Sequence, residues 1–417
     1  MNKEQIFTSK STIISFDLKH RKTINFNIGK YNDAVKIGKK QYCNLDEVRN
    51  IAHQLKKQAI ENLDNYLIEF EEKVIRNGGN VIWANDSDDA LNAILAIAKK
   101  NNCTSVVKSK SMVTEEIHLN KFLEKNNIES IETDLGEYIQ QLDNEPPYHI
   151  VTPAMHKSKE DVAALFHKHL HTPLNYTPEQ LTLEARKQLR KKYVEAQIGI
   201  TGANFILPDI GGIAITENEG NARLSMALPK IHIAIVGIEK VIPSYQDLAL
   251  FWSLLATHGT GQQITVYNSI ITGPKQINET DGPAEFHVIL LDNGRSNLLA
   301  DKELRKSLYC IRCGACLNAC PVYKNIGGHS YNTTYSGPIG AVISPHLNNF
   351  HELKHISNAS SLCGNCTEVC PVKIPIHELI LQNRFYAVEQ NEVSFSEKMA
   401  WKIWKMTVLN RKRMNMG

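Results

Sequence analysis

A helical spacing of apolar positions begins after Asn44, and Asn44 with Glu47 forms a capping-box start. The three- and four-residue steps continue to a glycine-containing stop at residues 77–79. One long amphipathic helix over residues 44–78 is therefore predicted. Residues 1–43 have no clear period and remain an unassigned N-terminal segment.

Between residues 79 and 297, short apolar runs alternate with segments of helical period. Strands alternating with helices are typical of an α/β domain with a largely parallel sheet. Glycines at residues 199–202 and 211–212 predict turns within this domain. The predicted strands cover residues 81–83, 105–107, 149–151, 231–237 and 285–291, and the predicted helices cover residues 88–101, 114–126 and 178–197.

The pattern changes near Asn297, where we place a domain boundary. Strand signals disappear, cysteines and prolines become frequent, and a mostly α-helical domain is expected over residues 298–390. Residues 391–417 form a basic amphipathic tail with Ile403 and Trp404 on one helical face. We favour packing of this tail on its own protein or on a partner subunit over contact with a membrane surface.

Composition excludes several classes of function. The chain has 417 residues, enough for two or three domains, and a net charge of +3, which is too mild for a nucleic-acid-binding protein. Its apolar stretches are too short to span a bilayer, and its first residues lack the apolar run of a secretory leader. We therefore expect a cytoplasmic protein without a transmembrane segment.

The nine cysteines are distributed unevenly. Cys43 and Cys103 stand alone and are interpreted as ordinary thiols, whereas the other seven lie between Cys310 and Cys370. Disulfide frameworks belong to short secreted chains, so in this long chain the clustered thiols indicate metal ligands in a reducing compartment.

Residues 310–321 read C-x2-C-x2-C-x3-C-P, a ferredoxin pattern. In this pattern the first three thiolates bind one iron–sulfur cluster, and the cysteine before proline, here Cys320, ligates the other cluster. A structural zinc site is the alternative, but zinc needs only four ligands, usually in two separated pairs. Two iron–sulfur clusters that carry electrons singly are therefore predicted.

The second motif has one cysteine fewer, because Ser360 stands where its first cysteine is expected. Because no cysteine fills the fourth ligand position, the cluster on this motif is either a [3Fe-4S] cluster or a [4Fe-4S] cluster whose fourth ligand is Ser360, water or a group from a partner. His329, in the connection between the motifs, either tunes a cluster through a hydrogen bond or merely packs. Crossed ligation assigns Cys310, Cys313, Cys316 and Cys370 to cluster 1 and Cys320, Cys363 and Cys366 to cluster 2, both most simply [4Fe-4S].

Several strings before these motifs are similar to one protein family, including VKSKSMVTEEI at residues 107–117. From about residue 60 to about residue 384 the chain resembles the iron–sulfur subunits of the bacterial L-lactate utilization complex, the lactate utilization protein B family. The resemblance implies a lactate-utilization (LUD) domain, with the sheet of sugar-phosphate isomerases and CoA transferases, followed by a ferredoxin-type domain. The other similar strings lie at residues 132–139, 201–205, 218–221 and 292–297.

The resemblance also implies a function. It suggests an electron-transfer subunit, non-catalytic or co-catalytic, of a complex that oxidises L-lactate to pyruvate for growth on lactate. The implied partners are two sister subunits and an unidentified electron acceptor, and the three-cysteine second motif is part of the family pattern. The chain departs from the family at residues 208–211, where it has Pro-Asp-Ile-Gly instead of the common Ala-Asp-Thr-Gly. It also matches the family poorly over residues 1–50, and family members commonly have a longer C-terminal tail.

Two groups of polar residues in the α/β domain suggest an alternative function. Lys108, Lys110 and Ser111 follow a predicted strand, where they can bind an anion or form a solvated loop. Glu217 and Glu219, in a polar loop with Arg223, line a site or stabilise a turn. In this alternative the LUD domain itself binds or transforms a small acid or phosphorylated ligand, with the clusters as redox accessories.

Residues 258–262 form a glycine loop that only weakly suggests a phosphate cradle. The sequence has no Walker or dinucleotide fingerprint, so no flavin or nicotinamide site is predicted, and the catalytic residues are unknown. A third possibility is a scaffold in which the clusters only stabilise the fold.

Overall fold

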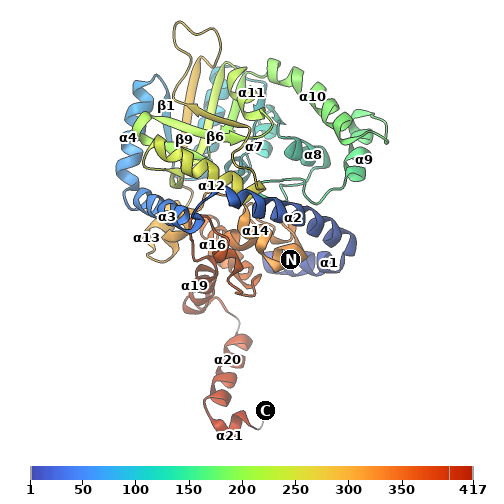
Figure 1. The fold of residues 1–417 in the computed structure, drawn as a ribbon, viewed down its shortest axis with the longest axis vertical. Coiled ribbons are helices and arrows are strands. Elements are labelled where there is room, and N and C mark those ends of the chain that lie inside the picture. Colours follow the sequence, from blue (N-terminus) through green and yellow to red (C-terminus); the bar gives the residue numbers. More distant parts are fainter. Residues whose placement is uncertain (1, 394, 416–417) are drawn as a thin grey trace.

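A six-stranded parallel sheet organises the α/β part of the computed structural model, which describes residues 2–393 and 395–415 (Figure 1). The strand order is β1-β9-β7-β4-β2-β3, and all neighbouring strands are parallel. Central strand β7 is buried over its whole length, as expected for a sheet covered on both faces. The strands are β1 (Asn80–Ala84), β2 (Ser105–Lys108), β3 (Glu129–Glu132), β4 (Ile198–Gly202), β7 (Ile231–Gly237) and β9 (Glu285–Leu291).

Alternating residues of β7 enter two different cores. Ile233 packs with helices α5 to α7 on one face, whereas Ala234 packs with α4 and a small antiparallel sheet on the other. That small sheet has the order β5-β6-β8. These and the remaining elements are α3 (Leu45–Glu61), α4 (Leu63–Arg76), α5 (Ser87–Lys100), α6 (Met112–Glu116), α7 (Leu119–Lys125), α8 (Leu135–Asp143), α9 (Lys159–Leu170), α10 (Pro178–Glu195), β5 (Phe205–Leu207), β6 (Gly212–Glu217), α11 (Asn221–Ala227), α12 (Leu248–Thr260), β8 (Tyr267–Ile271) and α13 (Arg295–Ala300).

The cysteine-containing part, residues 298–390, lies below the sheet in Figure 1 and contains only helices and loops among the described residues. We call it the cysteine domain, and residues 79–297 the sheet domain. The core of the cysteine domain continues into the N-terminal helices, since Leu317 and Ile24 belong to one buried cluster. Its helices are α14 (Ala315–Ala319), α15 (Pro321–Ile326), α16 (Gly337–Leu347), α17 (Phe350–Leu353), α18 (Asn365–Glu368) and α19 (Ile376–Glu389).

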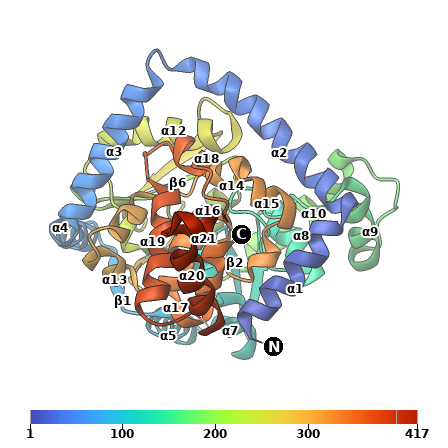
Figure 2. The same cartoon turned by 90° about the horizontal axis from the view of Figure 1, so that it is seen from below.

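The N-terminal segment, unassigned from sequence, forms α1 (Lys3–Phe16) and α2 (Leu18–Gly38). Figure 2 shows them in blue along the rim of the molecule, with α1 against α15 of the cysteine domain. Helix α1 buries no residue and α2 buries only Ile24, Ile28 and Gly38, which explains the weak apolar period.

Two predicted helices are each divided in the structure. The predicted helix over residues 44–78 is wrong as one element, because Asn62 leaves helical geometry (φ −124°) and separates α3 from α4. The side chain of Asn62 donates to the carbonyl of Gln58 and so closes the end of α3. The predicted helix over residues 114–126 is likewise two helices, α6 and α7, with His118 between them in left-handed geometry.

Two other predicted elements are also corrected. Residues 149–151 form no strand, since the Val151 N–H turns back to His149 Nδ1 (3.1 Å). Residues 199–202, predicted as a turn, form central strand β4. A Cβ at Gly199 would lie 1.6 Å from the Ser225 carbonyl oxygen, so the glycine permits close approach of α11 rather than a turn.

The tail forms α20 (Phe395–Val408) and α21 (Arg411–Met414), which extend away from the rest of the chain (Figure 1). No described side chain of α20 is buried, so the favoured packing on its own protein is absent there. Trp401 and Trp404 contact each other edge-on and are more than half exposed. Among the described residues, no helix combines the length and apolar character needed to cross a membrane.

Candidate iron–sulfur centre and adjoining pocket

The structure brings four cysteines to one small cavity of the cysteine domain. Cys310, Cys313 and Cys316 come from the loop before and into α14, and Cys370 comes from the distant second motif. The loop turns tightly because Arg312 has a positive φ of 61°. These are the four residues that the sequence assigns to cluster 1.

Backbone amides of this site point at sulfur. The N–H of Arg312 donates to Cys310 Sγ and the N–H of Ile374 donates to Cys370 Sγ, each at 3.4 Å. Such donors favour the thiolate form. Burial, with Cys310 nearby, nevertheless raises the pKa of Cys370 to about 12, and burial also raises the pKa of Cys313. As thiolates, these buried cysteines would repel one another and accept hydrogen bonds from the amides. They fit a cationic iron centre that compensates the thiolate charge.

Cys320, Cys363 and Cys366 form a second, more open group. Burial and then the charge of Cys320 raise the pKa of Cys366 to about 11. Cys363 is exposed, and the backbone N–H of Asn365 lowers its pKa. Cys320 Sγ accepts a hydrogen bond from the N–H of Tyr323 (3.4 Å). These thiols fit a cluster that reaches solvent on one side.

Ser360 occupies the backbone position of the missing cysteine. Ser360 Oγ accepts from the N–H of Leu362 (3.1 Å), as Cys310 Sγ accepts from the N–H of Arg312, and Leu362 and Arg312 both have positive φ. Arg384 donates to the Ser360 carbonyl (2.7 Å) and fixes this turn. The second motif therefore keeps the geometry of the first, with a hydroxyl in place of a thiol.

We expect Ser360→Cys to protect cluster 2 from losing iron. An iron without a thiolate ligand is easily removed, so mild oxidation of the unaltered protein should convert one cluster to a three-iron form. In the variant this conversion should fall by about tenfold, roughly the effect of restoring one strong ligand. Paramagnetic resonance measures the three-iron signal. Ser360→Ala is the control and should convert at least as fast as the unaltered chain; equal conversion in Ser360→Cys would contradict the expectation.

His329 contacts the sheet domain rather than a cysteine. Its Nε2–H donates to the Pro146 carbonyl (2.7 Å), and its ring packs edge-on against Tyr148. This placement favours the packing interpretation. Glu145, His156 and His329 have ligand atoms within 4.8 Å of one another, but Lys157 Nζ already lies 2.9 Å from Glu145 Oε2.

Cys43 and Cys103 lie apart from both groups. Cys43 is exposed, whereas Cys103 is buried and its Sγ contacts the Ser105 carbonyl. Burial raises the pKa of Cys103, as for an inert thiol.

Comparison with known proteins identifies two regions of the chain. Residues 67–291 match the LUD domain, and residues 306–374 match the 4Fe-4S dicluster domain. Lactate utilization protein B of Bacillus subtilis is 46% identical over 90% of this chain and 78% of its own length. The protein of the same name from a Geobacillus species is 48% identical over 86% of this chain and 76% of its own.

The chain belongs to the lactate utilization protein B family. The fold class predicted from sequence, an α/β LUD domain followed by a mostly helical ferredoxin-type domain, is confirmed, and the chain has an iron–sulfur domain. A crystal structure of a DUF162 family protein from Deinococcus radiodurans also resembles 55% of this chain and 98% of its own, at 12% identity and a TM-score of 0.31.

In this member of the family, a pocket of about 600 Å³ lies where the LUD sheet meets the cysteine domain. It brings together Lys110 and Ser111, which follow β2, Glu217 at the end of β6, and Glu219 just after β6. Burial and the nearby Asp134 carboxylate raise the pKa of Glu219 to about 7. The lining of the pocket also includes Asn27, Tyr31, Asn204, Lys240, Gly259, Thr260, Arg312, Cys313 and Tyr335.

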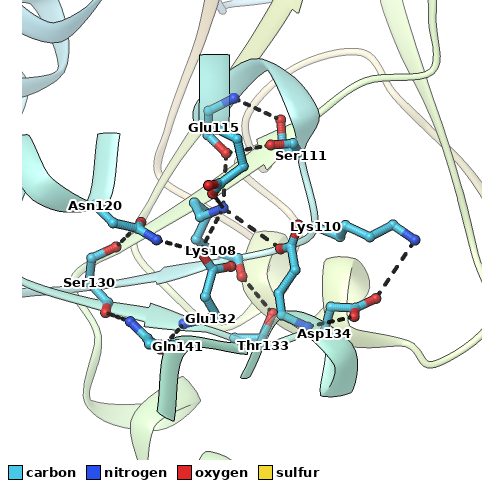
Figure 3. A network of polar contacts seen from close by, with 12 residues as sticks. Lys108, Lys110, Ser111, Glu115, Asn120, Ser130, Glu132, Thr133, Asp134 and Gln141 are labelled. Carbon is cyan, nitrogen blue, oxygen red and sulfur yellow. Dashed lines mark hydrogen bonds and ion pairs between the residues drawn. The ribbon is translucent and has the colours of Figure 1, made fainter. Parts of the chain in front are cut away.

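Lys108 is not among the residues that line this pocket. Figure 3 shows its side chain beside Glu115 and Glu132. Its ammonium is fully buried and pairs with Glu132 (2.8 Å) and Glu115 (3.1 Å), with Glu137 3.8 Å away. These carboxylates overcome the cost of burial and raise the pKa of Lys108 above its ordinary value. Lys108 therefore stabilises the domain interior and is neither a solvated residue nor an anion ligand.

The other loop candidates have mainly structural contacts. Ser111 Oγ caps α6, and the Arg223 guanidinium lies 5.3 Å from the centre of the Tyr267 ring. His258 Nδ1–H donates to the Leu254 carbonyl within α12 (2.9 Å). The predicted glycine loop over residues 258–262 is wrong, because residues 258–260 are the last turn of α12. Gly259 and Thr260 line the pocket from this helix end rather than from a phosphate-binding loop.

A buried ion network joins the two domains, and the sequence did not reveal it. Arg295, 1% exposed, donates from Nε to Glu239 (2.6 Å) and from Nη1 and Nη2 to the two oxygens of Glu116 (2.9 Å each). The hydroxyl of Tyr335 in the cysteine domain donates to Glu116 as well (2.6 Å). Arg312, also in the cysteine domain, lies with its Nη2 3.5 Å from Glu239 Oε1.

Proposed function

We propose that this chain is the iron–sulfur electron-transfer subunit of a complex that oxidises L-lactate to pyruvate. The observation that carries the proposal is the convergence of seven cysteines into two groups within one domain, in a chain whose relatives are named for lactate utilization. We propose a cytoplasmic complex with two sister subunits and a separate electron acceptor.

Lactate oxidation releases two electrons, and an iron–sulfur cluster carries one electron at a time. Two clusters in series can therefore pass the two electrons to an acceptor in single steps. In the proposed assignment Cys310, Cys313, Cys316 and Cys370 hold cluster 1, and Cys320, Cys363 and Cys366 hold cluster 2. The chain supplies amide donors to the sulfurs and excludes water with apolar neighbours. Ile150, Ile339 and Ile374 line the first cavity for this purpose.

The test is lactate-dependent reduction of the purified complex. Anaerobically purified protein should contain about seven to eight irons per chain with matching sulfide, as two clusters require. Adding L-lactate to the chain with its sister subunits should bleach the visible absorption of the clusters, whereas D-lactate should not. Paramagnetic resonance identifies which cluster receives the electron.

The isolated chain serves as the control in this experiment. Its clusters should be reducible by a chemical reductant but not by L-lactate alone. Zinc in place of iron would refute the metal assignment. Clusters that stay oxidised in the intact complex with L-lactate would refute the electron-transfer role.

A further inference from the structure

The pocket at the sheet edge and the cavity of the four cysteines share a wall. Ile150, Arg312 and Cys313 line both spaces. The pocket is closed on another side by Asn27 and Tyr31 of α2. A molecule in the pocket therefore lies directly against the loop that carries three of the proposed cluster 1 ligands.

Two cationic side chains at this wall have donors without acceptors. Lys240 is 6% exposed, and its ammonium has no hydrogen bond or ion pair within the described part of the chain. Arg312 Nη1 is buried and has no hydrogen-bond partner among the described residues. The ring of Tyr335 lies 4.4 Å from the Arg312 guanidinium and orients its plane. Buried donors of this kind require an acceptor, and a carboxylate supplies two oxygens for them.

Two carboxylates also line the pocket, and Lys110 lies 3.8 Å from one of them, that of Asp134. Glu219 is the other, and the orientation of both is fixed because Asp134 Oδ1 accepts from the N–H of Gly136 (2.9 Å) and Glu219 Oε2 accepts from the N–H of Leu135 (3.1 Å). Carboxylates there accept hydrogen bonds from a hydroxyl group and repel a second anionic group. The pocket thus offers cationic donors for an acid group and carboxylate acceptors for a hydroxyl group.

We propose that this pocket binds a small hydroxycarboxylate, with its carboxylate on Lys240 and Arg312 and its hydroxyl directed toward Asp134 and Glu219. The volume of about 600 Å³ lies in the range of small-molecule sites and leaves room for water beside the ligand. This inference goes beyond electron transfer, since it places an acid-binding site on the same chain as the clusters. It does not rest on the proposed function, because lactate bound by a sister subunit can still reduce the clusters.

Calorimetric titration of the full-length, cluster-loaded chain tests the proposal. L-lactate should bind, and propanoate, which lacks the hydroxyl, should bind about tenfold more weakly, as expected for one lost hydrogen bond to a charged group. Lys240→Met should weaken L-lactate binding by at least about tenfold for the same reason. Lys275→Met, at an exposed lysine outside the pocket, is the matched control and should bind as the unaltered chain does.

Glu219→Ala provides a second variant away from the cysteines. It should discriminate less between L-lactate and propanoate than the unaltered chain does, because one of the two acceptors for the hydroxyl is gone. Iron content and the visible spectrum confirm that each variant is loaded. Absence of L-lactate binding, unchanged binding in Lys240→Met, or unchanged discrimination in Glu219→Ala would overturn the proposal. Inorganic phosphate binding more tightly than L-lactate would also overturn it and assign the pocket to a phosphorylated ligand.

Discussion

Cys370→Ser is expected to remove cluster 1 and to leave cluster 2 in place, although Cys370 belongs to the second motif. Cys370 is 6% exposed and lines the cavity of Cys310, Cys313 and Cys316. Arg49 holds this cysteine in position by donating from Nε (3.1 Å) and Nη2 (2.9 Å) to its carbonyl. A serine hydroxyl is a poor substitute for thiolate, so the iron content should fall by about half.

Iron analysis and paramagnetic resonance of the anaerobic protein measure this effect. The reciprocal variant, Cys320→Ser, should instead damage cluster 2, while Cys43→Ser, at an exposed thiol outside both groups, should leave both clusters intact. Loss of cluster 2 rather than cluster 1 in Cys370→Ser would show that each motif ligates its own cluster. The crossed assignment would then be wrong.

Arg295→Met should destabilise the protein by about 3–5 kcal/mol, the usual cost of leaving buried carboxylates without their cation. Glu116 and Glu239 would both lose this partner, and Glu116 would keep only the uncharged donors Tyr335 and Asn293. Urea unfolding of the anaerobic protein, followed by circular dichroism, measures the effect. Arg186→Met, at an exposed arginine, is the control and should change stability by less than about 0.5 kcal/mol.

The ion network around Arg295 also predicts that the stability of the fold depends on pH. Burial opposes ionisation of Glu239, but the charges of Arg295, Lys240 and Arg312 together outweigh burial and hold the pKa of Glu239 at about 2. A carboxylate with a lowered pKa stabilises the fold above its unfolded pKa, about 4.3, and this contribution is lost as the pH falls toward 2. In Arg295→Met this acid-dependent contribution should become smaller, because one of the three cations that lower the pKa of Glu239 is gone. Equal urea midpoints for Arg295→Met and Arg186→Met near neutral pH would show that the network is not stabilising.

Elements that carry their own pattern could be predicted from the sequence. The apolar runs of β7 and β9 and the cysteine spacing are local features, and each is visible without knowing its neighbours in space. Strand β4 was missed because its glycines serve a contact with Ser225 of α11, which only the folded chain reveals. Helix α1 was missed because it buries no side chain and so has no strong apolar period.

The pocket could be predicted only in part. Lys110 and Glu219 were singled out as members of separate loops, but their meeting depends on the order of strands in the sheet. Lys240 gave no signal because a single lysine after an apolar strand is unremarkable in sequence. Lys108 was placed wrongly for a similar reason, since its partner Glu132 comes from β3 (Figure 3). A further carboxylate near it, Glu137, comes from α8.

The position of α1 and α2 has a consequence for synthesis of the chain. Lys10 in α1 donates to the Asn332 side chain, 322 positions later, and α1 packs on α15 and on the turn at His329–Tyr331. A ribosome adds roughly 5–20 residues per second, so the first helix waits on the order of 15–60 s for its binding surface to be made. Helix α1 is therefore synthesised well before the surface on which it packs, and a nascent chain that ends before the cysteine domain leaves α1 without that surface.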